Sequence, residues 1–296
     1  MTLLERLAPA LFVLIWSTGW IAARYAAPHA DPLTFLCLRF AFAFAVVAAI
    51  ALAARAPWPV RGFGLLHALV SGALLHALYL GGVWWAIGHG LPAGISGLIA
   101  GLQPILTALL APSLVGERIG PLQWAGIAVG FAGIALVLQP GLAGLGAERL
   151  AAVLTPIGVN VGAMLAVTLG TFYQKRHLAT GDLRAMTALQ YLGALIVLAP
   201  IAYALEPGRL DWNATTILVM AWSVLGLSVG AIGFLLLLIR RGAVSRTAAL
   251  IYLVPPTVAL EAALLFGETL SALQVAGVAL TAAGVALAVR RAASAA

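Results

Sequence analysis

The chain alternates between long apolar stretches and short breaks that carry proline, glycine or charged residues, such as those at 28–32 and 206–209. A helix needs about 20 apolar residues to cross the hydrocarbon core of a bilayer, and ten stretches reach about that length. The pattern predicts an all-α polytopic membrane protein with ten transmembrane helices. The spans are expected at about 8–26, 33–54, 63–87, 92–114, 121–139, 152–173, 185–205, 215–239, 243–266 and 271–289.

The second half of the chain repeats the first. With a shift of 151 residues, 91–138 aligns with 242–289 without a gap, and 17 of the 48 positions are identical. Five spans per half is an odd number, so the second half enters the membrane from the opposite side. We therefore expect two inverted five-helix repeats, at 1–145 and 152–296, an architecture found in many secondary transporters. A duplicated structural bundle without a transport role is the alternative.

Composition narrows the class of protein. Hydrophobic residues make up 63% of the 296 positions and charged residues 8%, whereas soluble domains carry about 25% charged residues. That excludes a soluble enzyme, a disordered chain and a nucleic-acid binder. The single cysteine, Cys37, excludes an internal disulfide framework and a multi-cysteine metal site. We expect neither a metal nor a cofactor.

The basic residues behind the net charge of +7 are distributed unevenly between the two sides of the membrane. Of the 16 basic residues, 12 fall in segments that share a side with the N-terminus and 4 fall on the other side. Short loops rich in lysine and arginine stay in the cytoplasm. Both termini are therefore predicted to be cytoplasmic.

Several short motifs follow one another in a definite order. They are Trp16-Ser17-Thr18-Gly19, Leu38-Arg39-Phe40, Leu102-Gln103-Pro104, Gly116-Glu117-Arg118, Gln123-Trp124-Ala125-Gly126, Val254-Pro255-Pro256 and Gly267-Glu268-Thr269. Their order and spacing resemble the drug/metabolite transporter superfamily, specifically its EamA-type exporters. The resemblance covers nearly the whole chain, and within the family the chain is most similar to exporters of aromatic amino acids.

The resemblance implies a carrier in the plasma or inner membrane that exports small metabolites. It also implies that spans 3, 4, 8 and 9 line the central path, while spans 5 and 10 brace the bundle. One departure from the family pattern is the doubled proline, Pro255-Pro256, which leaves the shape of span 9 open.

Polar side chains in spans 3 and 4 are candidates for the substrate path, because they are unfavourable against lipid and should face inward. Pro104 removes a hydrogen bond from span 4, and interrupted helices at mid-membrane bind substrate in many transporters. His76 can donate to a carboxylate or take part in proton coupling. A helix-packing stripe in span 4 and a structural role for His76 are the alternatives. The candidates are Ser96, Gln103 and Thr107 in span 4 and His76 and Tyr79 in span 3.

Further candidates come from spans 1, 8 and 9. Trp16 and Trp20 lie one turn apart and can form, with Tyr79, an aromatic surface for a ring or a cation. Ser223 lies among the glycines of span 8, where helix packing is the alternative role. Tyr252 lies in the middle of span 9 beside the proline pair and is expected to face the path.

Two charged residues fall inside predicted spans. Glu261 is a candidate proton or cation site, and the alternative is that it reaches water or pairs with Arg24 or Arg39. Arg39 is a candidate for holding an anionic group of the substrate, and the alternative is an ion pair with Asp31.

Spans 5 and 10 carry small residues and a preceding acidic residue. Glu117 and Glu268 are expected to cap the N-termini of these spans, where a carboxylate is favourable. The glycines allow close helix packing either within the chain or between protomers. They are Gly126, Gly130, Gly133, Gly277 and Gly284.

Membrane lipid and a small-molecule substrate are the expected partners. Both a monomer and a homodimer are left open.

We therefore expect a secondary transporter that exports small metabolites, above all amino acids, across the cytoplasmic membrane by alternating access. An exporter of drugs or other organic metabolites is the first alternative, and a channel, which kinetics would distinguish, is another. An intramembrane protease is disfavoured. The stretch 94–97 matches its GxSG pattern, but the only later histidine, His177, falls in a predicted loop. No catalytic residue is expected, and no phosphate-binding motif supports an ATP-driven pump.

Overall fold

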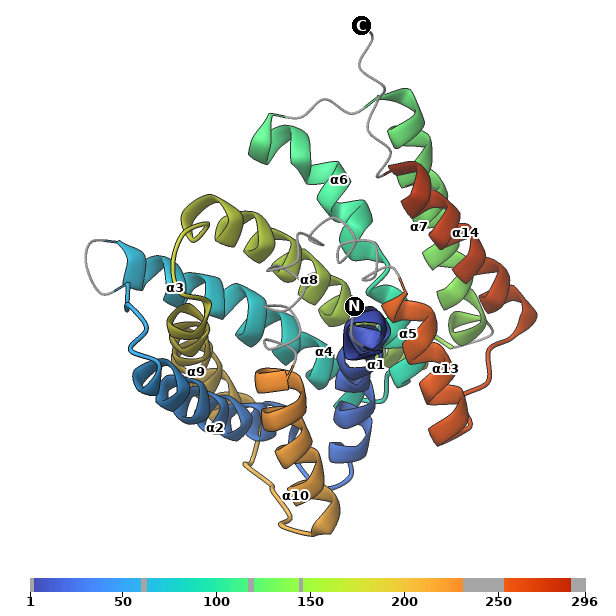
Figure 1. The fold of residues 1–296 in the computed structure, drawn as a ribbon. Helices are drawn as coiled ribbons and strands as arrows, with labels where there is room; N and C mark the ends of the chain where they lie inside the picture. The colour runs from blue at the N-terminus through green and yellow to red at the C-terminus, as the bar shows by residue number, and fades with distance from the viewer. Residues whose placement is uncertain (1–2, 60–62, 117–119, 144–145, 231–252, 289–296) are drawn as a thin grey trace, which may run out of the picture.

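A computed structural model of the chain describes residues 3–59, 63–116, 120–143, 146–230 and 253–288 (Figure 1). Tyr252 and Glu117 lie outside these residues. Within them the regular structure is helical, and one isolated antiparallel bridge joins Ala30 to Leu210. The helices are α1 (Leu3–Ala26), α2 (Pro32–Ala53), α3 (Gly64–Gly72), η1 (Ala73–Leu78), α4 (Tyr79–Gly88), α5 (Ala93–Ile99), α6 (Leu102–Val115), α7 (Pro121–Leu142), α8 (Ala147–His177), α9 (Leu183–Leu205), α10 (Ala214–Ala221), η2 (Trp222–Gly230), α13 (Val254–Phe266) and α14 (Ala272–Ala288).

Each of the ten predicted spans coincides with helical structure, although spans 8 and 9 are described only in part. Span 3 is built from α3, η1 and α4, and span 4 from α5 and α6. Among the described residues, six helices are long and apolar enough to cross a membrane, and three shorter apolar helices accompany them. The prediction of an all-α polytopic membrane protein is confirmed.

Capping residues mark the ends of several helices. The carboxylate of Asp182 accepts a hydrogen bond from the backbone N–H of Arg184 and so caps α9, and the amide of Asn213 caps α10 in the same way. Gly116 and Gly267 end α6 and α13 in the left-handed conformation, with φ of 73° and 67°. These two glycines occupy equivalent positions in the repeats. Glycine is favoured at both because each helix ends in the left-handed conformation.

Equivalent helices of the two halves pack against each other. Helix α2 packs on its equivalent α9, and α7 packs on its equivalent α14. Between the equivalent spans 4 and 9, α5 of span 4 packs on α13 of span 9. Figure 1 shows the α7–α14 pair at one side of the bundle and the α2–α9 pair at the other. Packing of equivalent helices on each other is expected for helices that lie beside the two-fold axis relating inverted repeats.

A seam of glycines brings α7 and α14 into backbone contact. A Cβ atom on Gly133 would lie 2.7 Å from the carbonyl oxygen of Gly277, and one on Gly277 would lie 2.7 Å from that of Gly133. A Cβ on Gly284 would likewise lie 2.7 Å from the carbonyl oxygen of Gly126. The seam therefore packs α7 against α14 within the chain.

A π-helical segment interrupts the third span of each half. The segments are η1, residues 73–78, and η2, residues 222–230. A shift of 151 residues places 73–78 inside 222–230, so the wide turn recurs at the same position of both repeats. Such segments occur frequently at functional sites, because the extra residue in the turn breaks the regular hydrogen bonding.

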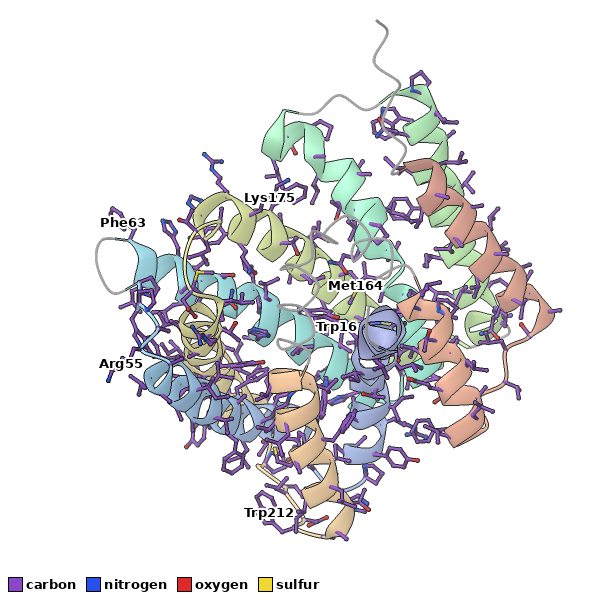
Figure 2. The ribbon with its side chains drawn as sticks, in the orientation of Figure 1. Trp16, Arg55, Phe63, Met164, Lys175 and Trp212 are labelled. Atoms are coloured by element: carbon purple, nitrogen blue, oxygen red, sulfur yellow. The ribbon has the colours of Figure 1, made fainter. Side chains whose placement is uncertain are left out.

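Large apolar side chains cover the outside of the bundle, as Figure 2 shows for the side chains that project away from the helices. Leu264, Leu218 and Ile196 expose 76%, 69% and 58% of their surface. Phe63 and Trp212, labelled in Figure 2, are also exposed and precede α3 and α10. In water such a surface would aggregate, whereas in a bilayer it contacts lipid.

Candidate functional site

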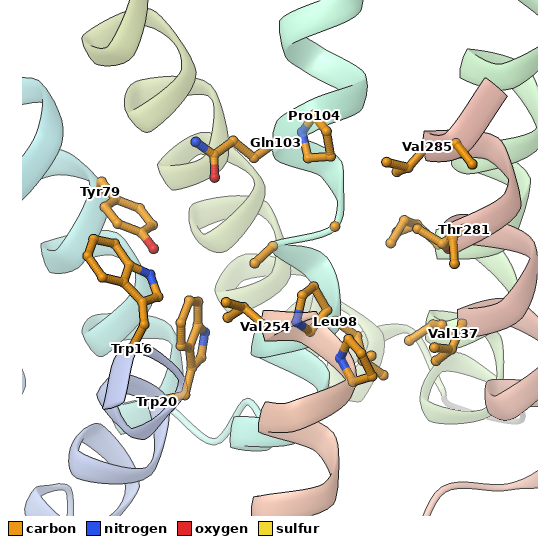
Figure 3. Close-up of a pocket in the computed structure, with 18 residues that line it drawn as sticks. Trp16, Trp20, Tyr79, Leu98, Gln103, Pro104, Val137, Val254, Thr281 and Val285 are labelled. Carbon is orange, nitrogen blue, oxygen red and sulfur yellow. The ribbon is translucent and has the colours of Figure 1, made fainter. Parts of the chain in front are cut away.

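A cavity of about 210 Å³ lies where the two halves meet, and it is open enough to hold several waters or a small ligand. Residues of α1, α4, α5, α6 and α13 form one part of its wall, and residues of α7 and α14 form the rest. Figure 3 shows Trp16, Trp20 and Tyr79 on one side, and Val137, Thr281 and Val285 facing them across the cavity.

Equivalent positions of the two repeats line this cavity together. Gln103 pairs with Val254, Pro104 with Pro255, and Ile134 with Val285 under the shift of 151 residues, and all six line the wall. The cavity therefore lies on the axis that relates the halves. That is the position at which transporters built from inverted repeats bind substrate.

The fourth span is interrupted at the cavity. Helix α5 ends at Ile99 and α6 begins at Leu102, with Ala100 and Gly101 between them. Because Pro104 has no N–H to donate to Ala100, the carbonyl of Ala100 instead accepts from the N–H of Gln103 at 3.1 Å. The first turn of α6 then presents the Gln103 amide to the cavity.

A buried hydrogen-bond network supports the aromatic wall. The indole N–H of Trp20 donates to Ser96 Oγ at 3.1 Å, and Asn160 Nδ2 donates to the same oxygen at 3.0 Å. Ser96 therefore lies behind the wall rather than in it. Sequence reasoning missed Asn160, whose signal was a lone amide inside the apolar sixth span.

The aliphatic wall comes from spans 5 and 10. The resemblance to known transporters implied that these spans only brace the bundle. In the structure they do both, because α7 and α14 pack tightly along the glycine seam and also line the cavity with Ile134, Val137, Thr281 and Val285.

Among the predicted site residues that the structure describes, four line the cavity, namely Trp16, Trp20, Tyr79 and Gln103, and the rest of these described residues lie elsewhere. His76 lies in η1, and its ring stacks on Tyr191 with centroids 4.7 Å apart. Thr107 donates to the carbonyl of Gln103 at 2.8 Å. Ser223 is buried in η2 without a hydrogen-bond partner for its Oγ.

The ion pairs given as alternatives for the two intramembrane charges are wrong. The carboxylate of Asp31 accepts from the N–H of Arg209 at 2.7 Å, so Arg39, two turns into α2, does not reach it. Glu261 Oε1 accepts from Ser17 Oγ at 2.8 Å and pairs with neither arginine.

The expected role of Glu268 as a cap of span 10 is also wrong. Its carboxylate accepts from the N–H groups of Ala93 and Gly94 at 3.2 and 2.8 Å, and it therefore caps α5. Arg24 approaches the same carboxylate to 4.0 Å. The chain folds back so that the turn before α14 lies over the start of α5. At α14 itself, Ser271 Oγ accepts from the N–H of Gln274.

Comparison with known proteins gives consistent matches. A model of the EamA-like transporter family matches residues 7–139 and again 155–290. A "Probable amino-acid metabolite efflux pump" of Salmonella typhimurium strain LT2 is 26% identical over 286 residues, which are 93% of this chain and 91% of that protein. A "Riboflavin transporter" of Rhizobium johnstonii is 28% identical over 189 residues, 62% of this chain and 55% of that protein.

A solved crystal structure that is 22% identical in sequence superposes with a TM-score of 0.62. The match covers 96% of this chain and 97% of that chain. At this level of identity the likeness concerns the fold alone, and it agrees with the helical arrangement described above.

Proposed function

Since the chain belongs to the EamA-like transporter family, we propose that it is a secondary transporter that exports amino acids, aromatic and other neutral ones, by alternating access across the cytoplasmic membrane. The observation that carries this proposal is the cavity on the repeat axis. One wall of it is aromatic, and an interrupted helix presents Gln103 to it.

The chemistry of the cavity suits an amphipathic small molecule. Trp16 and Trp20 offer flat faces for an apolar or aromatic side chain. At the other end, the Gln103 amide and the start of α6 offer donors, and a helix N-terminus favours negative charge. An amino acid combines the two features. The relative named an amino-acid metabolite efflux pump adds support for this substrate class.

Export of larger organic metabolites is the second candidate. The aromatic wall also suits a heterocycle, and one relative is named a riboflavin transporter. This alternative makes the same use of Trp16 and Trp20 but places no demand on the polar end of the cavity.

We base the proposals for orientation and assembly on the sequence and on the glycine seam. We propose that both termini are cytoplasmic, because 12 of the 16 basic residues fall on their side. The glycine seam is already satisfied within the chain, so it leaves no reason for a dimer along α7 and α14. Glu261 is the proposed coupling group, because a carboxyl inside a span can carry a proton.

The test is substrate counterflow in proteoliposomes made of phosphatidylethanolamine and phosphatidylglycerol. A panel of amino acids, together with riboflavin, is presented to vesicles preloaded with the same compound. Saturable exchange of an amino acid supports the proposal. Exchange of riboflavin alone favours the alternative, and flux that does not saturate contradicts a carrier.

Two tryptophan variants place the site in the same assay. Trp20→Ala removes part of the cavity wall and is expected to weaken exchange, whereas Trp212→Ala, in an exposed loop position, is the matched control. Equal exchange by both variants would contradict the placement of the path.

A further inference from the structure

Arg39 is a buried cation without an acidic partner among the residues that the structure describes. Only 5% of its surface is exposed, and its Nε has no hydrogen-bond acceptor. Arginine stays protonated in proteins, so burial leaves a full charge. A buried, unpaired charge is strongly unfavourable unless something compensates it.

The surroundings of Arg39 compensate its charge only in part. The guanidinium lies over the ring of Trp84, 5.8 Å from its centroid, which is a favourable cation–π geometry. The phenol groups of Tyr79 and Tyr191 also lie close enough to interact electrostatically with its charge. None of these groups carries a formal negative charge, so the environment accommodates the cation without neutralising it.

The acidic residues near the ends of α2 and α9 are engaged elsewhere. Glu206 accepts hydrogen bonds from the N–H groups of Leu33 and Thr34 at 2.9 and 2.7 Å. Asp31 interacts with Arg209. Neither carboxylate can turn to Arg39 without leaving those donors unpaired.

Tyr79 connects this charge to the cavity. It interacts electrostatically with Arg39, and it also lines the cavity together with Trp16. Figure 3 shows its hydroxyl directed toward the space between the tryptophans and Gln103. A positive charge near a phenol makes its hydroxyl a stronger hydrogen-bond donor. This end of the cavity therefore favours an anionic group.

We propose that Arg39 determines specificity for a carboxylate, with Tyr79 donating to that carboxylate while the apolar part of the substrate packs on Trp16 and Trp20. This inference rests on the proposed function, and it adds that a free carboxylate is required of the substrate. Arg39 acts through Tyr79 and through its charge, and is therefore a positioning residue rather than a direct contact in this conformation.

The test compares phenylalanine with its methyl ester and with phenethylamine as competitors of labelled phenylalanine in counterflow. All three carry the same ring, and only phenylalanine carries the carboxylate. With the unaltered protein we expect the ester and the amine to compete about tenfold or more weakly, the value for loss of a charge-assisted hydrogen bond. Equal competition by all three would overturn the inference while leaving the proposed function standing.

Variants then assign the preference to Arg39. Arg39→Gln is expected to reduce the ratio between acid and ester to near one, and Arg39→Lys, which keeps the charge, to restore part of it. Arg209→Gln changes an exposed arginine outside the cavity and should leave the ratio unchanged. An unchanged ratio in Arg39→Gln would overturn the inference.

Tyr79→Phe provides a second test of the inference, because it keeps the ring and removes only the hydroxyl. If Arg39→Gln does not yield folded protein, the ratio measured with Tyr79→Phe decides. A ratio near one supports the inference, and an unchanged ratio overturns it. Absence of saturable exchange of any amino acid by the unaltered protein would instead contradict the proposed function.

Discussion

The indole N–H of Trp20 donates a hydrogen bond to Ser96 Oγ over 3.1 Å, and this bond joins the first span to the interrupted fourth span. The bond fixes the plane of the indole against the cavity. Asn160 completes the network from α8 by donating to the same hydroxyl oxygen. Ser96 and Asn160, which do not line the cavity, thereby hold Trp20, which does.

Ser96→Ala is therefore expected to weaken substrate binding although Ser96 contacts no substrate. Loss of one buried hydrogen bond is worth about 1 kcal/mol, which corresponds to about a fivefold rise in the half-saturation concentration. Counterflow kinetics measure this value. Ser113→Ala is a suitable control, because that exposed hydroxyl only donates within its own helix. No change in half-saturation for Ser96→Ala would refute a positioning role.

The same network predicts strong coupling between Asn160 and Ser96. Asn160→Ala alone should act in the same direction as Ser96→Ala, because both remove support from Trp20. The double variant should be little worse than either single variant, since the second change finds the network already broken. Additive effects on half-saturation would show that the two residues act independently.

The glycine seam predicts a stability effect at Gly133. A Cβ there would lie 2.7 Å from the carbonyl oxygen of Gly277, so Gly133→Ala must push α7 and α14 apart. We expect lower yield and a lower midpoint of thermal unfolding in detergent. Gly162→Ala in α8 is the matched control, because nothing lies within 4 Å of its added Cβ. There alanine is expected to be neutral, or stabilising by up to about 1 kcal/mol.

Apolar span length and the 151-residue repeat predicted the fold well, because both can be recognised without knowing which helices become neighbours. The left-handed ends at Gly116 and Gly267 belong to the same class of signal. The alternative pairing of Arg39 with Asp31 and the predicted cap of span 10 by Glu268 failed for the opposite reason. Each was inferred from proximity along the chain, whereas the acidic partners bind backbone N–H groups of other segments.

The candidate site was predictable only in part. Trp16, Trp20, Tyr79 and Gln103 line the cavity, and each stood out as a polar or aromatic residue in an apolar span. The contribution of α7 and α14, and the network through Asn160, depend on which helices become neighbours. Periodicity within one helix carries no information about that choice.

The Asp182–Arg184 pair predicts how stability depends on pH. The side-chain hydrogen bond from Arg184, with Nη2 to Oδ2 at 2.7 Å, is the main reason that the pKa of Asp182 lies below its ordinary value. A depressed folded-state pKa gives stability that is fully present above the unfolded pKa, about 3.9, and is lost as the pH falls through the lower folded pKa. Asp182→Asn should therefore lower the unfolding midpoint at pH 7. The gap to the unaltered protein should close below about pH 4. A gap that stays constant down to pH 3 would contradict this assignment.

Glu206 joins two helices, and its loss is expected to destabilise the fold. It accepts from the N–H groups of Leu33 and Thr34 and from the hydroxyl of Thr34, so it caps α2 from the end of α9. Glu206→Ala leaves those donors without their partner and is expected to destabilise the fold by about 1–2 kcal/mol. Glu206→Gln keeps one acceptor and should fall between. Thermal unfolding in detergent measures both, and equal midpoints for all three proteins would show that the cap contributes nothing.

Glu261 supplies the test of coupling. Its Oε1 accepts from Ser17, while its Oε2 is buried without a partner. Among the described side chains of the helices packed against α13, α1 carries Arg24, which lies by Glu268, and Tyr25, whose ring contacts Phe266. Helix α5 carries no titratable side chain. Glu261→Gln preserves an acceptor for Ser17 but cannot take up or release a proton. If Glu261 carries the coupling proton, a pH gradient across the liposome membrane should stimulate amino-acid uptake by the unaltered protein and not by Glu261→Gln. Counterflow without a gradient should persist in both proteins.

Glu268→Gln, which alters a cap rather than an intramembrane carboxyl, is the control and should keep its response to the gradient. An equal response by Glu261→Gln would move coupling to another group.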